Sequence, residues 1–169
     1  MRRLPRRLAL VSLVALAIVS GAGLVRAHAK MATSAGASNA TLILVEHADQ
    51  VTEIDLGEPG PSTGDMLVWG LNALYDQADG DDTGTITQGT CITCNASADC
   101  LAAETILCPD GSTLEFHGIE RGGGVPSART IVGGSGRYLG AIGTMTAAPS
   151  ADLTLWTKTI EIAVPPSGS

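Results

Sequence analysis

Glu46 is the residue of this sequence best placed to do chemistry in an apolar interior. Successive side chains of a β-strand point to opposite faces, so in an expected strand over residues 41–48 the Glu46 side chain points the same way as Leu42 and Leu44. A carboxylate that shares an interior with leucines can act as a general acid or base, or stabilise a developing positive charge. The structural alternative is that the strand ends at Glu46, which then lies in solvent.

Asn72 carries a similar signal in an expected strand over residues 65–75. An amide on an apolar interior face can hold a water or a substrate oxygen, whereas the structural alternative is that Asn72 satisfies the backbone of a bulge. Both faces of this strand carry bulky apolar side chains: Met66, Val68 and Leu74 beside Asn72, and Leu67, Trp69, Leu71 and Tyr75 opposite. A strand that is apolar on both faces predicts that a second subunit covers the outside of the sheet.

The remaining polar clusters predict surface structure. Residues 76–82 hold four aspartates, but they lack the closing glutamate of a calcium loop, so a solvated loop is expected. Glu115 and His117 alternate with apolar residues and fit the outer face of a strand. Arg137 fits an exposed turn. We therefore expect neither a metal nor a cofactor.

The four cysteines are clustered in sequence. Cys91, Cys94, Cys100 and Cys108 lie within eighteen residues. In an exported chain, clustered thiols are expected to form disulfides, and four cysteines allow three pairings. A zinc site is disfavoured because there is only one close pair, at Cys91 and Cys94, and no histidine lies nearby in sequence.

Export is predicted from the start of the chain. Arginines precede an apolar run over residues 8–24, and Ala27 to Ala29 form a small-x-small cleavage site, so residues 1–29 are interpreted as the signal peptide of a secreted, extracellular protein. Cleavage leaves 140 residues, enough for one domain, with five basic and seventeen acidic residues and a net charge of −12. That charge makes nucleic acid and anionic membrane surfaces poor partners.

Short β-rich runs between turn-forming residues dominate the rest of the chain. Residues 30–40 are small and polar and are expected to form a disordered lead-in, and residues 164–169 a short tail. Eight strands and no convincing helix are expected over residues 41–163: 41–48, 65–75, 84–93, 99–107, 112–119, 128–132, 138–147 and 152–163. This spacing predicts an all-β fold, an eight-stranded antiparallel up-and-down barrel.

A glycine-rich segment makes the barrel prediction more specific. Residues 133–143 follow the pattern Gly-Gly-Ser-Gly-x-Tyr-x-x-Ala-x-Gly. Together with Gly64-Asp65, with Asn-Ala-Leu-Tyr-Asp at residues 72–76 and with Gly-x-Cys at residues 89–91, this pattern resembles the plant allene oxide cyclases and the related dirigent proteins. The resemblance covers residues 42–162 and implies a barrel with an interior cavity.

The resemblance also implies roles for particular residues. Glu46 resembles the cavity carboxylate of the plant cyclases, and Asn72 resembles the asparagine that helps to hold an ordered water, so both are predicted catalytic residues. Cys91 matches a cavity cysteine and is the predicted ligand-binding residue. The family-like positions imply a Cys91–Cys100 disulfide, which leaves Cys94 for Cys108. Because plant allene oxide cyclases form trimers, a homotrimer is expected.

The function implied is that of a secreted barrel acting on a small hydrophobic molecule. We expect the cavity to bind this molecule and to promote its cyclisation or stereocontrolled conversion, as an isomerase or cyclase. Ala48 stands where the plant enzymes have a second asparagine, so the resemblance does not extend to their particular substrate. The alternative is a non-catalytic extracellular carrier or binding protein that uses the same cavity for a lipophilic ligand.

Overall fold

Alternating apolar residues build nine β-strands in the part of the chain that this computed structural model describes, residues 37–57 and 59–166. The strands are β1 (Ser38–His47), β2 (Val51–Ile54), β3 (Met66–Tyr75), β4 (Asp82–Thr93), β5 (Cys100–Leu107), β6 (Thr113–Glu120), β7 (Ser127–Gly134), β8 (Ile142–Pro149) and β9 (Leu155–Val164). One short 3₁₀ turn, η1 (Gly136–Tyr138), lies between β7 and β8. Within these residues, no helix has the length and apolar character needed to cross a membrane.

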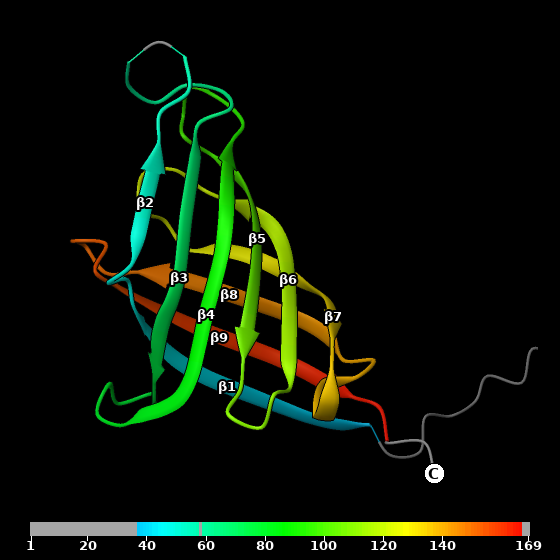
Figure 1. Cartoon of the computed structure of the whole chain (residues 1–169). Helices are drawn as coiled ribbons and strands as arrows, with labels where there is room; N and C mark the ends of the chain where they lie inside the picture. The colour runs from blue at the N-terminus through cyan, green and yellow to red at the C-terminus, as the bar shows by residue number, and fades with distance from the viewer. Residues whose placement is uncertain (1–36, 58, 167–169) are drawn as a thin grey trace, which may run out of the picture. The chain divides into compact units, whose positions relative to one another are not determined.

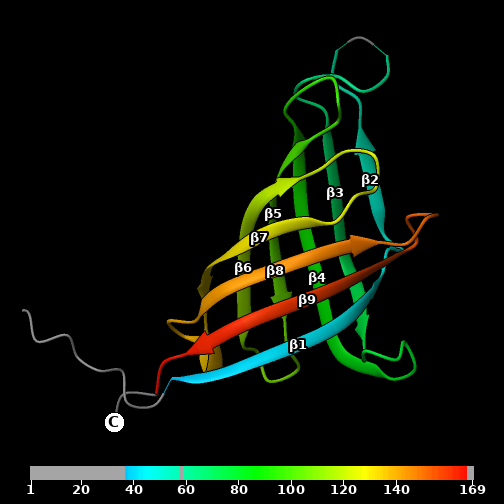
Figure 2. The same ribbon diagram turned by 180° about the vertical axis from the view of Figure 1, so that it is seen from behind.

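The sheet closes on itself. Neighbouring strands pair antiparallel in the order β1-β9-β8-β7-β6-β5-β4-β3, and β1 pairs again with β3, where Glu46 lies opposite Leu74. β2 adds only to the edge of β3, which leaves eight strands in the ring. Figure 1 shows β3 to β6 running steeply while β1, β8 and β9 cross obliquely, and Figure 2 shows the same crossing from behind. The predicted eight-stranded antiparallel barrel is therefore confirmed.

The strands begin and end within a few residues of the predicted positions, with three larger differences. β1 begins at Ser38 because its first residues pair with β9, so the expected lead-in of residues 30–40 ends earlier. The sequence pattern does not predict β2, a four-residue strand with every residue exposed. The expected strand over residues 138–147 begins only at Ile142, because η1 occupies the turn before it. The predicted signal peptide, residues 1–29, and residues 167–169 of the tail lie outside the described residues.

A β-bulge in β3 corrects the predicted faces of that strand. The pairing with β4 shifts between Gly70 and Asn72, so Leu71 is an extra residue and the alternation changes phase there. The inward side chains are Leu67 and Trp69 before the bulge and Asn72 and Leu74 after it. The expected grouping of Met66 and Val68 with Asn72 is therefore wrong. β3 has one interior face, so its composition does not by itself argue for a second subunit.

Two glycines allow this arrangement of β3 against β4. Gly70 has φ of +150°, and a Cβ at that position would lie 2.6 Å from Gln88 Cβ. Gly89 faces the interior opposite Trp69, and a Cβ there would lie 2.4 Å from the ring atom Cζ2 of Trp69. The absence of a side chain at Gly89 therefore makes room for the indole ring inside the barrel.

The barrel interior has two apolar parts separated by a charged layer. Successive inward residues of β5 are Ala102, Glu104 and Ile106, so a carboxylate lies between two apolar positions. The larger apolar part consists of Leu74, Ile106, Leu114, Phe116, Ile131, Ala141, Met145, Ala147, Ile160 and Ile162. The smaller part consists of Trp69, Cys91, Cys100 and Ala102, with Leu67 packed against it. An eight-stranded barrel is narrow enough for side chains to fill, and the larger part is filled in this way.

Candidate functional site

Glu46 and Asn72 meet inside the barrel, where β1 and β3 close the sheet. Both side chains are buried, with 4% and 1% of the residue exposed. Asn72 Nδ2 donates a hydrogen bond to Glu46 Oε1 at 2.7 Å, and Asn72 Oδ1 accepts one from the backbone N–H of Gln50 at 2.9 Å. The bulge is what turns Asn72 toward Glu46. The geometry brings the two predicted catalytic residues together, and their catalytic role stays a prediction.

Lys158 joins Glu46 to a second buried carboxylate. Its Nζ lies 2.8 Å from Glu46 Oε2 and 2.6 Å from Glu104 Oε1, and the lysine side chain is 2% exposed. Thr87 Oγ1 donates a further hydrogen bond to Glu104 Oε1 at 2.7 Å. A lysine and two carboxylates so far from water require this mutual pairing, because an unpaired buried charge is strongly destabilising.

Arg129 extends the same network to the cavity wall. Its guanidinium pairs with Glu104 through Nη1 and with Glu120 through Nη2. The guanidinium carbon also lies 5.7 Å from the centre of the Trp69 ring, within the range of a cation–π contact. We refer to Glu46, Glu104, Glu120, Arg129 and Lys158 as the buried charge cluster.

The pKa values of three members of the cluster are shifted, and the directions of the shifts differ. Burial favours neutral Glu104, but the charges of Lys158 and Arg129 outweigh burial and lower the pKa of Glu104. Burial also disfavours the charged amine, yet Glu104 and Glu46 raise the pKa of Lys158. In contrast, burial raises the pKa of Glu120, and the nearby Arg129 and Lys158 offset only part of that effect. Lys158 is therefore a fixed positive charge, and the raised pKa of Glu120 makes its carboxyl easier to protonate than that of an ordinary glutamate.

A small cavity lies beside the buried charge cluster. Its volume is about 40 Å³, and its lining residues are Glu46, Ala48, Val51, Leu67, Trp69, Glu120, Arg129, Trp156 and Lys158. A water molecule occupies roughly 30 Å³ of liquid, whereas pockets for drug-sized ligands measure roughly 300–1,000 Å³. A small organic molecule can enter only if a lining side chain moves.

Two buried N–H groups on the side chains that line this cavity have no acceptor within residues 37–57 and 59–166. They are Trp69 Nε1 and Arg129 Nε. Leaving a buried donor unpaired costs about 1–3 kcal/mol, and buried polar groups in proteins are rarely left in this state. Together with Glu120, whose pKa is raised by burial, these donors mark the cavity as a candidate functional site.

The cysteines follow only part of the predicted pairing. Cys91 and Cys100 form a disulfide between β4 and β5, as the resemblance implies. The expected Cys94–Cys108 pair is wrong, and both of these thiols are free. The reason is the antiparallel course of the strands: Cys94 follows the end of β4, whereas Cys108 lies at the far end of the eight-residue strand β5, roughly 25 Å away at about 3.4 Å per residue. Cys91, the predicted ligand-binding residue, is disulfide-bonded and does not line the cavity.

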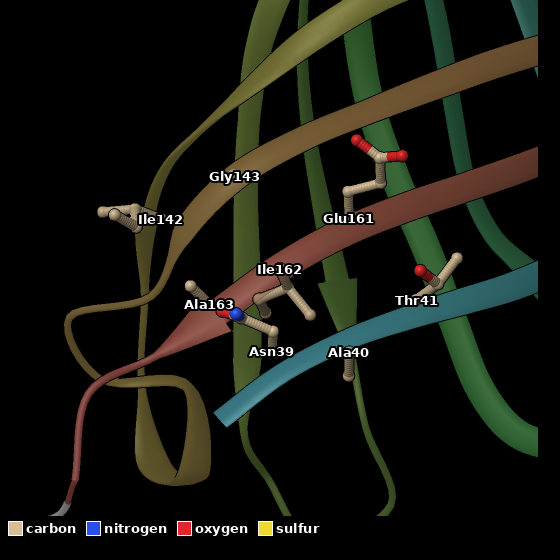
Figure 3. A pocket seen from close by; sticks show the side chains of 8 residues that line it. All are labelled: Asn39, Ala40, Thr41, Ile142, Gly143, Glu161, Ile162 and Ala163. Atoms are coloured by element: carbon tan, nitrogen blue, oxygen red, sulfur yellow. The ribbon is translucent and has the colours of Figure 1, made fainter. Parts of the chain in front are cut away.

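The aspartate-rich loop and Arg137 lie on the outside of the barrel, as predicted. Asp79 is exposed and pairs with His47, and Arg137 is exposed beside Tyr138. A larger hollow, about 470 Å³, lies over β1, β8 and β9 (Figure 3), and there Glu161 and Thr41 project on one side while Ala40 projects on the other. Glu161 is the only ionisable side chain among its lining residues, so this hollow lacks a partner for acid–base chemistry.

Sequence reasoning missed four members of the buried charge cluster and Trp69. The signal was present in the alternation: Lys158 shares a face with Ile160 and Ile162, and Glu104 shares one with Ala102 and Ile106. Arg129 similarly shares a face with Ile131. A charged residue at an inward position usually indicates a strand end or a surface, so the pattern becomes informative only when the partners are found on other strands.

The fold and site together define a small closed β-barrel with an interior polar site. No family model matches the sequence, and no curated protein sequence matches it. Solved structures do share the fold.

Three solved structures illustrate this likeness. A pyocyanin demethylase is 24% identical, with a TM-score of 0.64 over 73% of this chain and 99% of that chain. The pterocarpan synthase dirigent protein GePTS1 is 18% identical, with a TM-score of 0.63 over 76% of this chain and 89% of that chain. The Diels-Alderase AbmU from Streptomyces koyangensis is 23% identical, with a TM-score of 0.63 over 80% of this chain and 72% of that chain. These likenesses confirm, at the level of the fold, the predicted resemblance to dirigent-type barrels.

Proposed function

We propose that this barrel binds a small hydrophobic molecule at the cavity and promotes its cyclisation or stereocontrolled conversion. The observation that carries the proposal is the buried charge cluster on the wall of an interior cavity. Charges fixed in a water-poor interior can stabilise charge that develops in a transition state without having to reorganise. The structural neighbours that perform such steering, a dirigent protein and a Diels-Alderase, support this choice.

Access to the cavity is proposed at the end of the barrel that carries the disulfide. A hollow of about 190 Å³ lies there, and Leu67 and Glu120 line both this hollow and the cavity. Movement of Leu67 therefore joins the two spaces. The joined space is large enough for a small ring or a folded chain, whose reacting ends the walls would hold together.

Replacing Glu46→Gln tests the catalytic role. The variant keeps an oxygen that can accept from Asn72 and removes the negative charge beside Lys158. We expect conversion of the molecule extracted from the purified protein to fall more than about tenfold, with affinity unchanged, because the charge is needed more in the transition state than in the bound ground state. The measurement is kcat together with a binding titration.

Glu161→Gln is the matched control, because it removes a carboxylate from the outer face of β9. It should leave kcat unchanged. Full activity in the Glu46→Gln variant with the ligand still bound would contradict the catalytic proposal. That result would favour the second candidate, a carrier that uses the same cavity without chemistry.

We further propose that the protein acts outside the cell and as a homo-oligomer, most simply a trimer. The disulfide supports export, because disulfides persist in oxidising compartments. A row of outward apolar residues on five neighbouring strands supports self-association: Ile54, Met66, Ile92, Leu101 and Ile119 are consecutive register partners from β2 to β6. Such a continuous apolar band is unusual on a monomer.

Analytical ultracentrifugation at micromolar concentration tests the oligomer. We expect a mass near three subunits, and we expect Leu101→Lys to shift it toward one subunit because a charge in the middle of the apolar row opposes burial. Leu139→Lys is the matched control, since Leu139 is 72% exposed and lies outside the row. A monomer at all concentrations would contradict the proposal.

A further inference from the structure

The structure contains two buried hydrogen-bond donors that its own charge cluster does not use. Arg129 commits Nη1 and Nη2 to Glu104 and Glu120, and its Nε–H is left without an acceptor among the described residues. Trp69 likewise keeps a free Nε1–H, although only 8% of the residue is exposed. Both side chains line the 40 Å³ cavity, and the two lie in cation–π contact.

The charges around the cavity restrict what can accept from these donors. Each cation that lines it is already paired, Lys158 with Glu46 and Glu104, and Arg129 with Glu104 and Glu120. An anionic ligand would therefore meet two carboxylates, Glu46 and Glu120, and no free cation in the described wall. A cationic or donor-only ligand would leave the two N–H groups unpaired. A neutral acceptor oxygen suits both conditions.

We propose that the cavity recognises a neutral molecule whose apolar body carries a carbonyl oxygen, and that this oxygen accepts hydrogen bonds from Trp69 Nε1–H and Arg129 Nε–H. This inference rests on the proposed function, because it names the substrate class of the same site. The apolar body lies against the remaining wall, which includes Val51, Leu67 and Trp156. Donors on a conjugated carbonyl draw electron density from the neighbouring double bond, which activates that bond for ring closure.

The test compares two probes of the same shape that differ in the acceptor. Acetophenone carries a carbonyl oxygen, and 2-phenylpropene has a CH₂ group in its place. The chain contains only two tryptophans, Trp69 and Trp156, so a ¹H–¹⁵N spectrum of the full chain shows two indole N–H signals, which a Trp156→Phe variant assigns. We expect acetophenone to move the Trp69 indole proton downfield and to bind about tenfold more tightly than 2-phenylpropene. Benzoate, the anionic probe, is expected to bind more weakly than acetophenone.

Two variants separate the hydrogen bond from general packing. Trp69→Phe keeps an aromatic ring and removes the N–H, so it should reduce the preference for acetophenone over 2-phenylpropene to less than about threefold, because only acetophenone loses a hydrogen bond. Trp156→Phe, a change in the same wall that removes neither of the two unpaired donors, should change the affinities for acetophenone and 2-phenylpropene alike and so keep the ratio between them. The wild-type indole shift is an independent readout if the Trp69→Phe variant does not fold.

The outcomes distinguish this inference from the proposed function. Equal affinity for the two neutral probes, with the Trp69 signal unmoved, would overturn the carbonyl assignment and leave a hydrophobic binding site standing. Failure of both probes to bind at millimolar concentration would overturn the binding site together with the assignment. Tighter binding of benzoate than of acetophenone would overturn the choice of a neutral ligand.

Discussion

The Lys158→Met variant is expected to lose about 3–5 kcal/mol of the free energy of unfolding, the cost typical of breaking a buried ion pair by removing one partner. Methionine fills a similar volume, so the loss comes from charge and not from a void. Without Lys158, Glu46 keeps only its hydrogen bond from Asn72, and Glu104 keeps only Arg129 and Thr87. For a domain of this size the melting temperature should fall by roughly 10–20 °C.

Two comparisons make this expectation specific to the buried charge cluster. Arg121→Met removes a cation that pairs with Asp99 at 3.1 Å but whose side chain is 60% exposed, so the loss should be below about 1 kcal/mol. Adding Glu46→Gln to Lys158→Met removes a buried carboxylate that has lost its cation partner, so the double variant should recover part of the lost free energy of unfolding. A Lys158→Met variant as stable as the wild type in urea titrations would show that the cluster is not ionised as described.

Replacing both Cys91 and Cys100 by alanine is the second large effect we expect. The disulfide closes a loop with a sequence separation of nine, for which the chain-entropy relation gives roughly 2.5–3 kcal/mol of stabilisation. Both cysteines are also buried against Trp69, so the double variant loses packing next to the cavity. Equilibrium unfolding in urea, with and without reductant, measures the loss, and reductant should destabilise only the wild type.

Cys94→Ala is the matched control, because Cys94 is free and exposed, and its stability should change by less than about 0.5 kcal/mol. Thiol titration offers a second check: the native protein should react quickly at Cys94, and buried Cys108 should react only after unfolding. Four reactive thiols in the native, oxidised protein would contradict the Cys91–Cys100 bond.

The fold could be predicted from the sequence because strand alternation and turn residues are local properties. Leu42, Leu44 and Glu46 do share an inward face, and the glycine-rich segment does separate β7 from β8. The predicted faces of β3 were wrong because one inserted residue reverses the alternation of inward and outward side chains. The bulge at Leu71 reverses the phase of β3, and nothing in the apolar pattern of residues 66–75 distinguishes a regular strand from a bulged one.

The cysteines also show what the sequence can predict and what depends on the tertiary structure. Clustered cysteines in a chain expected to be exported indicate oxidation, but four cysteines allow three pairings. The resemblance implies the Cys91–Cys100 bond, and the antiparallel course of β4 and β5 shows that the remaining two cysteines do not pair. Cys91 and Cys100 are near partners across that pair, whereas Cys94 and Cys108 belong to opposite ends of the barrel.

The sequence by itself determined that the chain forms an antiparallel barrel, that Glu46 faces its interior and that Asn72 is a candidate partner. Only the tertiary structure decided what surrounds Glu46. Lys158, Glu104 and Arg129 lie on β9, β5 and β7, far apart in sequence, and closure of the sheet brings them together. The stability and the chemistry of a buried charge depend on the groups that pair with it. These partners lie on distant strands, and the pairing of distant strands is a property of the closed barrel and not of any local segment.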